Sequence, residues 1–130
     1  MDNDAKILLV DDERGVRRSM EKTLLRAGFD VYTAEDTLSG LALFKEAQEE
    51  GEPFDLALLD LHMPNLEGEE DPNAGLKLLS KLIEIEPELR VVVLTAYDEV
   101  ERAKEAISRK ARAYFVKGRE SELIDLIRTL

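Results

Sequence analysis

Apolar residues are grouped along the chain in five short runs, and stretches with the periodicity of amphipathic helices separate them. The runs predict strands at about 6–11, 30–34, 54–60, 90–95 and 113–117. Four of them are nearly continuous, which is typical of parallel strands that helices cover on both faces. The second run alternates apolar and polar residues and contains Asp30, so we expect it nearer an edge of the sheet.

Five helices are predicted from the apolar spacing and from start and stop signals. Their expected positions are about 14–27, followed by a Gly28 cap; 36–50; from Asp71-Pro72 or Asn73 to before Pro87; from Asp98, with Glu101 at capping-box spacing; and 120–130. The second helix is expected to bury Leu38, Leu41 and Ala42. Strands that alternate with helices imply right-handed βαβ crossovers. The predicted fold is therefore α/β, a doubly wound five-stranded parallel sheet with helices on both faces.

Composition and charge narrow the class of protein. The 130 residues suit one domain, 1–130, and contain no cysteine and a single histidine, so neither a thiolate site nor a histidine-rich zinc site is expected. A formal net charge of −11 disfavours nucleic-acid binding, because phosphate backbones are engaged through Lys and Arg. No apolar run approaches the length of a bilayer span, and the polar start is no signal peptide. We expect a soluble cytoplasmic protein that does not bind membranes.

Polar residues stand where four of the five predicted strands end. Asp11 and Asp12 follow the first strand, Asp60 ends the third, Thr95 the fourth and Lys117 the fifth. Because the carboxyl ends of parallel strands form one edge of a sheet, these side chains are expected to meet at one site. Oxygen-only ligands suit Mg²⁺, which typically takes one or two carboxylates together with phosphate oxygens. The set predicts a site that binds a divalent cation and handles phosphate.

Asp60 is the expected nucleophile of this site. A carboxylate can attack phosphorus to give an aspartyl phosphate, and a metal shields its charge from the incoming oxygens. Lys117 supplies a fixed positive charge and Thr95 a hydroxyl donor for those oxygens. Taken singly, each residue has an ordinary explanation: an Asp pair often starts a helix, and Thr95 and Lys117 suit a strand end and a surface. Their order at successive strand ends favours the functional interpretation.

Four segments together resemble the receiver domain of bacterial two-component response regulators, of the chemotaxis-regulator type. The segments are Ile7-Leu-Leu-Val-Asp-Asp-Glu13, Asp55-Leu-Ala-Leu-Leu-Asp-Leu-His-Met-Pro64, Leu94-Thr-Ala96 and Tyr114-Phe-Val-Lys117. The resemblance covers the chain from the first strand to the fifth helix. It implies a flavodoxin-like sheet with strand order 2-1-3-4-5 and a role as phosphoacceptor in a two-component or phosphorelay system.

The resemblance also assigns roles to residues of the site. It implies that Asp60 accepts phosphate from a histidine kinase or a histidine phosphotransfer protein. Asp11 and Asp12 would bind Mg²⁺ together with Asp60 and the main-chain carbonyl of His62. The His62 ring is expected only at the mouth of the site.

Further implied roles concern the response to phosphate. Thr95 and Lys117 would contact the phosphoryl group, and Tyr114 would reorient when Thr95 moves. His62 and Tyr97, each two residues beyond a site residue, would flank the approach of water. Both are bulky, so autodephosphorylation is expected to be slow.

The sequence departs from the family pattern at two places. Gly118 follows the lysine where members of the family usually have a proline with a cis bond, so that isomer is not expected here. The acidic segment 65–75 is several residues longer than the usual turn, and we interpret it as a tolerated surface insertion rather than a device for partner choice. The effector is not identified. A homodimer through the face of the fourth helix, fifth strand and fifth helix is a candidate, with Ile124 and Leu130 as exposed apolar residues.

Three other functions match parts of the pattern. A Mg²⁺-dependent phosphohydrolase or phosphotransferase acting on small molecules would usually need a second acid two residues after the nucleophile, where His62 stands. A flavin-binding electron carrier would need a phosphate-cradling first loop, and Asp11 and Asp12 would repel phosphate there. A receiver that binds partners without phosphate is disfavoured by the complete site. The protein is thus expected to catalyse only its own phosphorylation and dephosphorylation.

Overall fold

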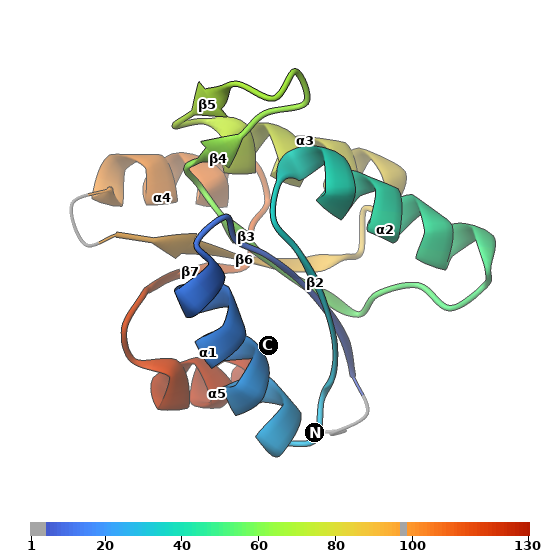
Figure 1. Cartoon of the computed structure of the whole chain (residues 1–130), viewed down its shortest axis with the longest axis vertical. Helices are drawn as coiled ribbons and strands as arrows, with labels where there is room; N and C mark the ends of the chain where they lie inside the picture. The colour runs from blue at the N-terminus through green and yellow to red at the C-terminus, as the bar shows by residue number, and fades with distance from the viewer. Residues whose placement is uncertain (1–4, 97–98) are drawn as a thin grey trace.

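A parallel five-stranded sheet forms the centre of the protein (Figure 1). The computed structural model describes residues 5–96 and 99–130. In spatial order the strands are β2 (Asp30–Ala34), β1 (Lys6–Val10), β3 (Leu56–Asp60), β6 (Arg90–Thr95) and β7 (Ala113–Val116). This order is the predicted 2-1-3-4-5, because the short strands β4 and β5 lie outside the sheet. The doubly wound fold and the edge position of β2 are confirmed.

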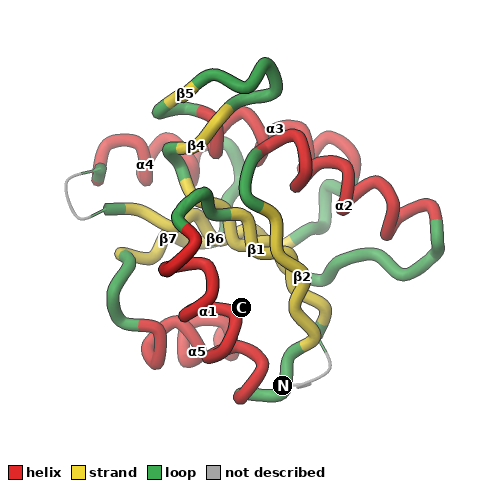
Figure 2. The backbone as a smooth tube through the Cα atoms, viewed as in Figure 1, coloured by secondary structure: helices red, strands yellow, loops and turns green. Residues whose placement is uncertain are grey.

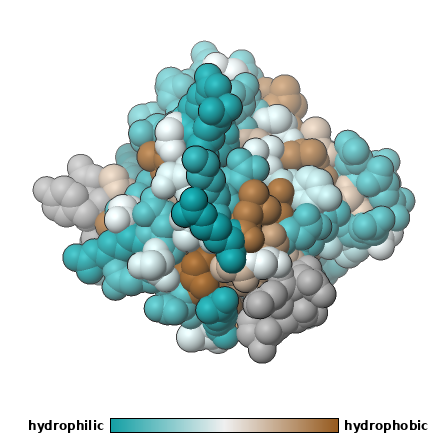
Figure 3. All heavy atoms as spheres, turned by 60° about the horizontal axis from the view of Figure 1, so that its bottom comes forward, coloured by the Kyte–Doolittle hydropathy of each residue, from teal (hydrophilic) through white to brown (hydrophobic). Residues whose placement is uncertain are grey.

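Helices cover both faces of the sheet (Figures 1 and 2). They are α1 (Arg14–Arg26), α2 (Thr37–Glu49), α3 (Ala74–Ile85), α4 (Val100–Ser108) and α5 (Glu120–Thr129). Helices α1 and α5 pack on one face, and α2, α3 and α4 lie on the other. The α1 and α5 side, turned forward in Figure 3, is mostly hydrophilic, with apolar side chains only in small patches. None of the helices in the described part of the chain has the length and apolarity that a bilayer span requires.

The two apolar cores lie on opposite faces of the sheet and share its central strands. Ile7 and Leu9 of β1 point to the core under α1 and α5, whereas Leu8 and Val10 point to the core under α2 and α3. All four side chains are fully buried. Burying each contributes about 1.5–3 kcal/mol relative to exposure. The central strands are thus held from both sides, which fixes where their carboxyl ends lie.

Strand β7 differs from the prediction that helices would cover it on both faces. Ala113 and Phe115 pack toward the α1 and α5 core, but Tyr114 and Val116 are 41% and 40% exposed. The physical reason is its position as the last strand of the sheet, where one face has little cover. A continuous apolar run does not by itself distinguish such an edge strand from a central one.

The inward face of α2 is also different from the prediction. Leu38 is 60% exposed and Ala42 is exposed, and only Leu41 of the expected three is buried. The helix buries Gly40 and Phe44 instead, because it approaches β1 closely. A Cβ atom at position 40 would come within 2.9 Å of a methyl group of Val10.

Other helix ends largely agree with the sequence. Gly28 has φ of +97° after α1, as expected for a left-handed cap, and α3 has Asn73 at its N-cap, one of the two predicted starts. Helix α4 has Glu99 at its N-cap rather than Asp98, which falls in the gap between the described ranges.

The acidic segment 65–75 forms the loop and second strand of an antiparallel hairpin and the start of α3, rather than a plain loop. The strands of the hairpin are β4 (Met63–Pro64) and β5 (Glu70–Asp71), and the hairpin lies beside the first turn of α3 (Figure 1). The Asn65 side chain accepts hydrogen bonds from the N–H groups of Glu67 and Glu69. The Thr37 hydroxyl donates to the Pro64 carbonyl at 2.9 Å, which attaches the hairpin to α2.

Helix α3 begins against the end of β3 at Gly75. The Gly75 N–H donates to the Leu61 carbonyl at 2.9 Å. A Cβ atom at Gly75 would overlap the Asp60 carbonyl oxygen and would lie 2.7 Å from Leu61 Cα. Backbone atoms of β3 cannot yield as a flexible side chain can, so glycine is required for this close approach.

Gly75→Ala should lower the free energy of unfolding by about 1–3 kcal/mol, because the added methyl group forces α3 away from β3. Gly15→Ala is the matched control, since Gly15 is also the second residue of its helix and a Cβ there meets nothing within 4 Å. It should be neutral or stabilising by up to about 1 kcal/mol. Urea denaturation of both variants measures the difference. Equal stabilities would show that the contact at Gly75 is not tight.

Candidate functional site

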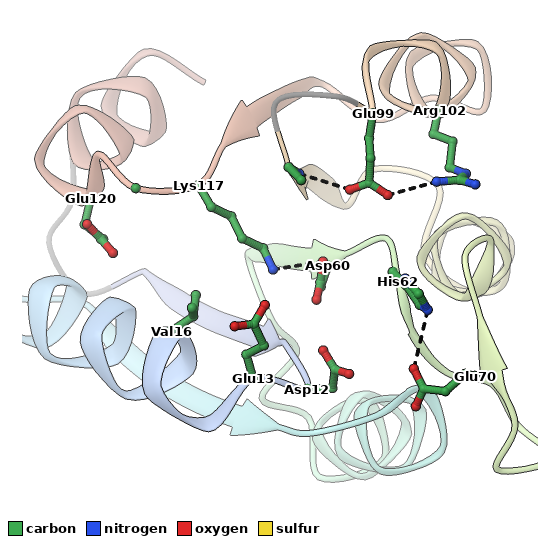
Figure 4. A pocket seen from close by; sticks show the side chains of 12 residues that line it. Asp12, Glu13, Val16, Asp60, His62, Glu70, Glu99, Arg102, Lys117 and Glu120 are labelled. Atoms are coloured by element: carbon green, nitrogen blue, oxygen red, sulfur yellow. Dashed lines mark hydrogen bonds and ion pairs between the residues drawn. The ribbon is translucent and has the colours of Figure 1, made fainter.

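The predicted polar residues come together at the carboxyl edge of the sheet. Carboxylate oxygens of Asp11, Asp12 and Asp60 all lie within 4.8 Å of one another. The Lys117 ammonium lies 3.0 Å from Asp11 Oδ2. It also lies 3.1 Å from Asp60 Oδ1 (Figure 4). Thr95 ends β6 and is buried, and its carbonyl accepts a hydrogen bond from the Lys117 N–H at 2.9 Å. The convergence that the sequence predicted is present.

Strand register explains why these residues meet. Val10 of β1 pairs with Leu59 of β3, so the next residue of each strand, Asp11 and Asp60, lies at the same level of the sheet edge. Thr95 of β6 pairs with Val116 of β7, which precedes Lys117. The lysine then reaches across the edge toward the carboxylates. Parallel pairing alone therefore assembles a site from residues that are far apart in the sequence.

The electrostatics of the cluster follow from its burial. Burial, together with the charge of Asp11, raises the pKa of Asp60 from 3.8 to about 7, although Lys117 opposes the shift. Burial by itself lowers the pKa of Lys117, but the attraction of Asp60 and Asp11 outweighs it and holds that pKa above its ordinary value. The charge of one ammonium therefore offsets only part of the cost of burying two carboxylates.

The acidic cluster suits a hard divalent cation. Its donors are carboxylate oxygens, which are the ligands that Mg²⁺ prefers. Asp11 Oδ2 is buried without a hydrogen bond of good geometry and has only the nearby charge of Lys117 as a partner. A buried anionic oxygen of this kind still has coordination capacity. The residues present therefore fit the cation that the sequence indicated.

The predicted switch residue, Tyr114, and a predicted flanking residue, His62, lie in different places. Tyr114 lies on β7 in register with Val93, two pairs before Thr95, and its ring is largely exposed. The His62 ring lies at the mouth of the site, as expected, where its Nε2 is 3.4 Å from Glu70 Oε1 (Figure 4). Tyr97 lies outside the described residues. The role of the His62 carbonyl as a metal ligand stays a prediction.

Further charged residues line the same cavity as Asp60 and were not identified from the sequence, among them Glu70, Glu99 and Arg102. Glu70 reaches it from the β4–β5 hairpin, while Glu99 and Arg102 reach it from the start of α4 (Figure 4). The acidic composition of segment 65–75 was a signal for Glu70, but it did not show which acid faces the site. For Glu99 and Arg102 the sequence has no comparable signal, because helix starts are often charged.

Comparison with known proteins identifies the family. Residues 7–128 match the family described as the response regulator receiver domain, and the chain belongs to that family. Receiver domains are the phosphoacceptors of two-component and phosphorelay signalling, and that is the function of this domain. The match favours this function over the small-molecule phosphohydrolase and the flavin carrier.

Individual relatives agree with this assignment. The response regulator protein FleR of Pseudomonas aeruginosa is 33% identical over 124 residues, which are 95% of this chain and 24% of FleR. The sporulation initiation phosphotransferase F of Bacillus subtilis is 29% identical, over 86% of this chain and 81% of its own length. The crystal structure of the receiver domain of NtrX from Brucella abortus is 31% identical, with a TM-score of 0.79 and 95% coverage of both chains. The chain spans about a quarter of the length of the first of these relatives.

Gly118 remains a departure from the family pattern. It has φ of +112°, which the proline ring cannot adopt, since proline is confined to φ near −65°. The chain therefore leaves Lys117 in a direction that a proline at this position would not allow.

Asp60→Asn should make the protein more stable at pH 8 in the absence of divalent cations, by up to about 4 kcal/mol. The pKa of Asp60 is about 7 in the folded protein and 3.8 in an ordinary carboxyl, so between these values the folded state holds a proton that the unfolded chain has released. Wild-type stability should then fall as pH rises from about 4 to about 7 and level off above it. The variant, neutral throughout, should lack this fall.

Urea denaturation in EDTA between pH 5 and pH 8 measures the effect. Asp30→Asn is the control, because Asp30 is exposed at the edge of the sheet and should change stability by less than about 0.5 kcal/mol. A loss of stability in Asp60→Asn at pH 8 would mean that the attraction of Lys117 outweighs burial.

Proposed function

We propose that Asp60 is the residue that accepts the phosphoryl group, from a phosphohistidine of a histidine kinase or a phosphotransfer protein. The observation that supports this is the position of its carboxylate, at the carboxyl edge of β3 and 3.1 Å from the Lys117 ammonium. A carboxylate oxygen attacks phosphorus and the P–N bond breaks. The electron pair leaves with the imidazole nitrogen of the donor, which takes up a proton.

Lys117 and Thr95 are proposed to receive the transferred group. The ammonium already lies beside Asp60 and neutralises negative charge on the phosphoryl oxygens as it develops. Thr95 ends the adjacent strand, where its hydroxyl can donate to the same oxygens. Both residues are held by β6 and β7, so little reorganisation is needed when phosphate arrives.

Mg²⁺ is proposed as the cofactor, held by Asp11, Asp12, Asp60 and the main-chain carbonyl of His62. When bound, it neutralises the charge that otherwise keeps an anionic phosphodonor away from the carboxylates. Around it, Asp11 and Asp12 supply oxygen ligands and Lys117 keeps its ion pair with Asp11. The raised pKa of Asp60 is consistent with a site that is incomplete without a cation.

The output surface is proposed to be the face formed by α4, β7 and α5. Among the side chains that the structure describes there, Ile107, Tyr114 and Val116 are exposed and apolar. The expectation that Ile124 is exposed was wrong, since it is 8% exposed and packs in the core under α5, and Leu130 is half-buried. An effector or a second copy of the chain would therefore meet α4 and β7 rather than the apolar side of α5. Movement of Thr95 toward phosphate and of Tyr114 behind it would alter this face.

The remaining expectations are part of the proposal. They are one receiver domain over 1–130, no catalysis beyond its own phosphorylation and dephosphorylation, a cytoplasmic location, and no nucleic acid or membrane as a partner. Tuning of dephosphorylation by His62 and Tyr97 stays a prediction.

Phosphoramidate with Mg²⁺ should add one phosphoryl group to the wild-type protein, and Asp60→Asn should take up none. The reason is that two buried carboxylates, those of Asp60 and Asp11, lie beside the Lys117 ammonium, and of these two only Asp60 lines the cavity. Asp125→Asn, an exposed position on α5, is the control and should be labelled like the wild type. Intact-mass spectrometry measures the product. Labelling of Asp60→Asn at the wild-type level would place the phosphoacceptor elsewhere.

Mg²⁺ should raise the melting temperature of the wild type progressively with concentration, because a ligand that binds only the folded state stabilises it. Asp12→Asn should lose most of this rise, since it removes a carboxylate of the cluster. Asp30→Asn removes the same charge outside the cluster and should keep the wild-type response. Thermal denaturation monitored by circular dichroism provides the measurement. An unchanged response in Asp12→Asn would mean that the cation binds at another position.

A further inference from the structure

The start of α4 places a carboxylate inside the phosphoacceptor cavity. Glu99 Oε1 accepts a hydrogen bond from the Ala96 N–H at 3.0 Å, and Glu99 Oε2 accepts one from Arg102 Nη1 at 2.9 Å (Figure 4). The Glu99 side chain is only 14% exposed. Ala96, Glu99 and Arg102 line the same cavity as Asp60 and Lys117. Glu99 thus has two donors in a cavity that is otherwise rich in carboxylates.

The Ala96 N–H is suited to an anionic oxygen. Ala96 follows the last residue of β6, and backbone N–H groups fixed at such positions stabilise anionic oxygens without reorganisation. In the structure a carboxylate oxygen of Glu99 holds this donor, and that oxygen stands in for an anion. A phosphoryl group on Asp60 brings anionic oxygens into the same cavity, where they need donors and where a second carboxylate repels them.

We propose that Glu99 is an internal competitor of the phosphoryl group: its carboxylate occupies the Ala96 N–H in the unphosphorylated protein, and a phosphoryl oxygen displaces it. This inference rests on the proposed phosphorylation of Asp60. Arg102 makes the exchange feasible, because it lies on the same helix three residues on and remains a partner for the carboxylate after it leaves. By occupying this donor, Glu99 lowers the affinity of the cavity for the phosphoryl group.

The competition also connects the cavity to α4. Glu99 is the N-cap residue of α4, and its own N–H donates to the Ala96 carbonyl at 3.1 Å. The side-chain bond to the Ala96 N–H is a second attachment of the helix start to the end of β6. Among the described side chains of α4, those that are buried are the small residues Ala103 and Ala106. Because so little apolar surface holds this helix, loss of one attachment shifts its position readily.

Binding of beryllofluoride, a phosphoryl mimic, in the presence of Mg²⁺ tests the proposal by isothermal titration calorimetry. Glu99→Ala should bind it about tenfold more tightly than the wild type, since loss of a charged hydrogen bond that competes is worth about 1.5 kcal/mol. Glu99→Gln keeps an acceptor but loses the charge, and should bind about threefold more tightly. Glu101→Gln is the matched control, because it removes the same charge two residues later from a side chain that is 91% exposed. It should change the affinity by less than twofold.

A second measurement tests the hydrogen bond between the Ala96 N–H and the Glu99 carboxylate in the absence of a phosphoryl mimic. In the ligand-free protein, the amide proton of Ala96 should shift upfield in Glu99→Ala relative to the wild type, because its charged acceptor is lost, and should stay in place in Glu101→Gln. Amide exchange in 100–108 should be faster in Glu99→Ala, as expected for a loosened α4. Both are measured by nuclear magnetic resonance.

The outcomes separate this inference from the proposed function. Wild-type protein that binds no beryllofluoride would overturn the assignment of the phosphoacceptor site itself. Wild-type protein that binds it, with Glu99→Ala and Glu99→Gln no tighter than Glu101→Gln, would overturn the competition alone. Weaker binding in both Glu99 variants would show that Glu99 assists the phosphoryl group, which is the opposite of the proposal.

Discussion

The ammonium of Lys117 lies between two buried carboxylates, so one positive charge faces more than one negative charge. The properties of the site depend on this imbalance. The ammonium is 3.0 Å from Asp11 and 3.1 Å from Asp60, with Asp12 close to both. One positive charge cannot neutralise three negative ones in a partly dehydrated place, so the pKa of Asp60 rises to about 7. The same excess of negative charge suits the cluster to a divalent cation. Without the lysine, burying these carboxylates together would cost considerably more free energy.

The sheet supplies the rigidity that such an unfavourable cluster requires. Central strands packed on both faces hold Asp11 and Asp60 at one level, and Gly75 lets α3 press against the end of β3. Repulsion among carboxylates would separate them on a flexible loop. Here any separation must disrupt the two apolar cores, which costs more than the repulsion relieves. Stability in the cores is thus used to maintain a strained site, as is common where binding or chemistry occurs.

Charged residues from two further segments surround the cluster of Asp11, Asp12, Asp60 and Lys117. The hairpin of β4 and β5 brings Glu70 to the mouth, beside His62, and the start of α4 brings Glu99 and Arg102 into the cavity. Glu70 adds negative charge at the mouth of the site, whereas the positive charge of Arg102 offsets that of Glu99. Segment 65–75 contributes Glu70 to the cavity, and its hairpin is bonded to α2 through Pro64. The interpretation of the segment as a tolerated insertion stays a prediction. The electrostatic potential at the mouth of the site therefore depends on these charged side chains and not on the fold alone.

The sequence by itself determined the strands, their alternation with helices and the five residues at the strand ends, because apolar periodicity and strand-end position are local properties. It also determined the edge position of β2, from the polar residues in that run. It did not determine that Tyr114 and Val116 are exposed, that α2 buries Phe44 rather than Leu38, or that Ile124 is in the core. Those outcomes depend on which elements lie side by side. The hydrogen bond from the Ala96 N–H to the Glu99 carboxylate was not predicted either, because it depends on how the start of α4 lies against the end of β6. Tertiary packing decides which segments contact one another, whereas the residues of one segment already determine its local pattern.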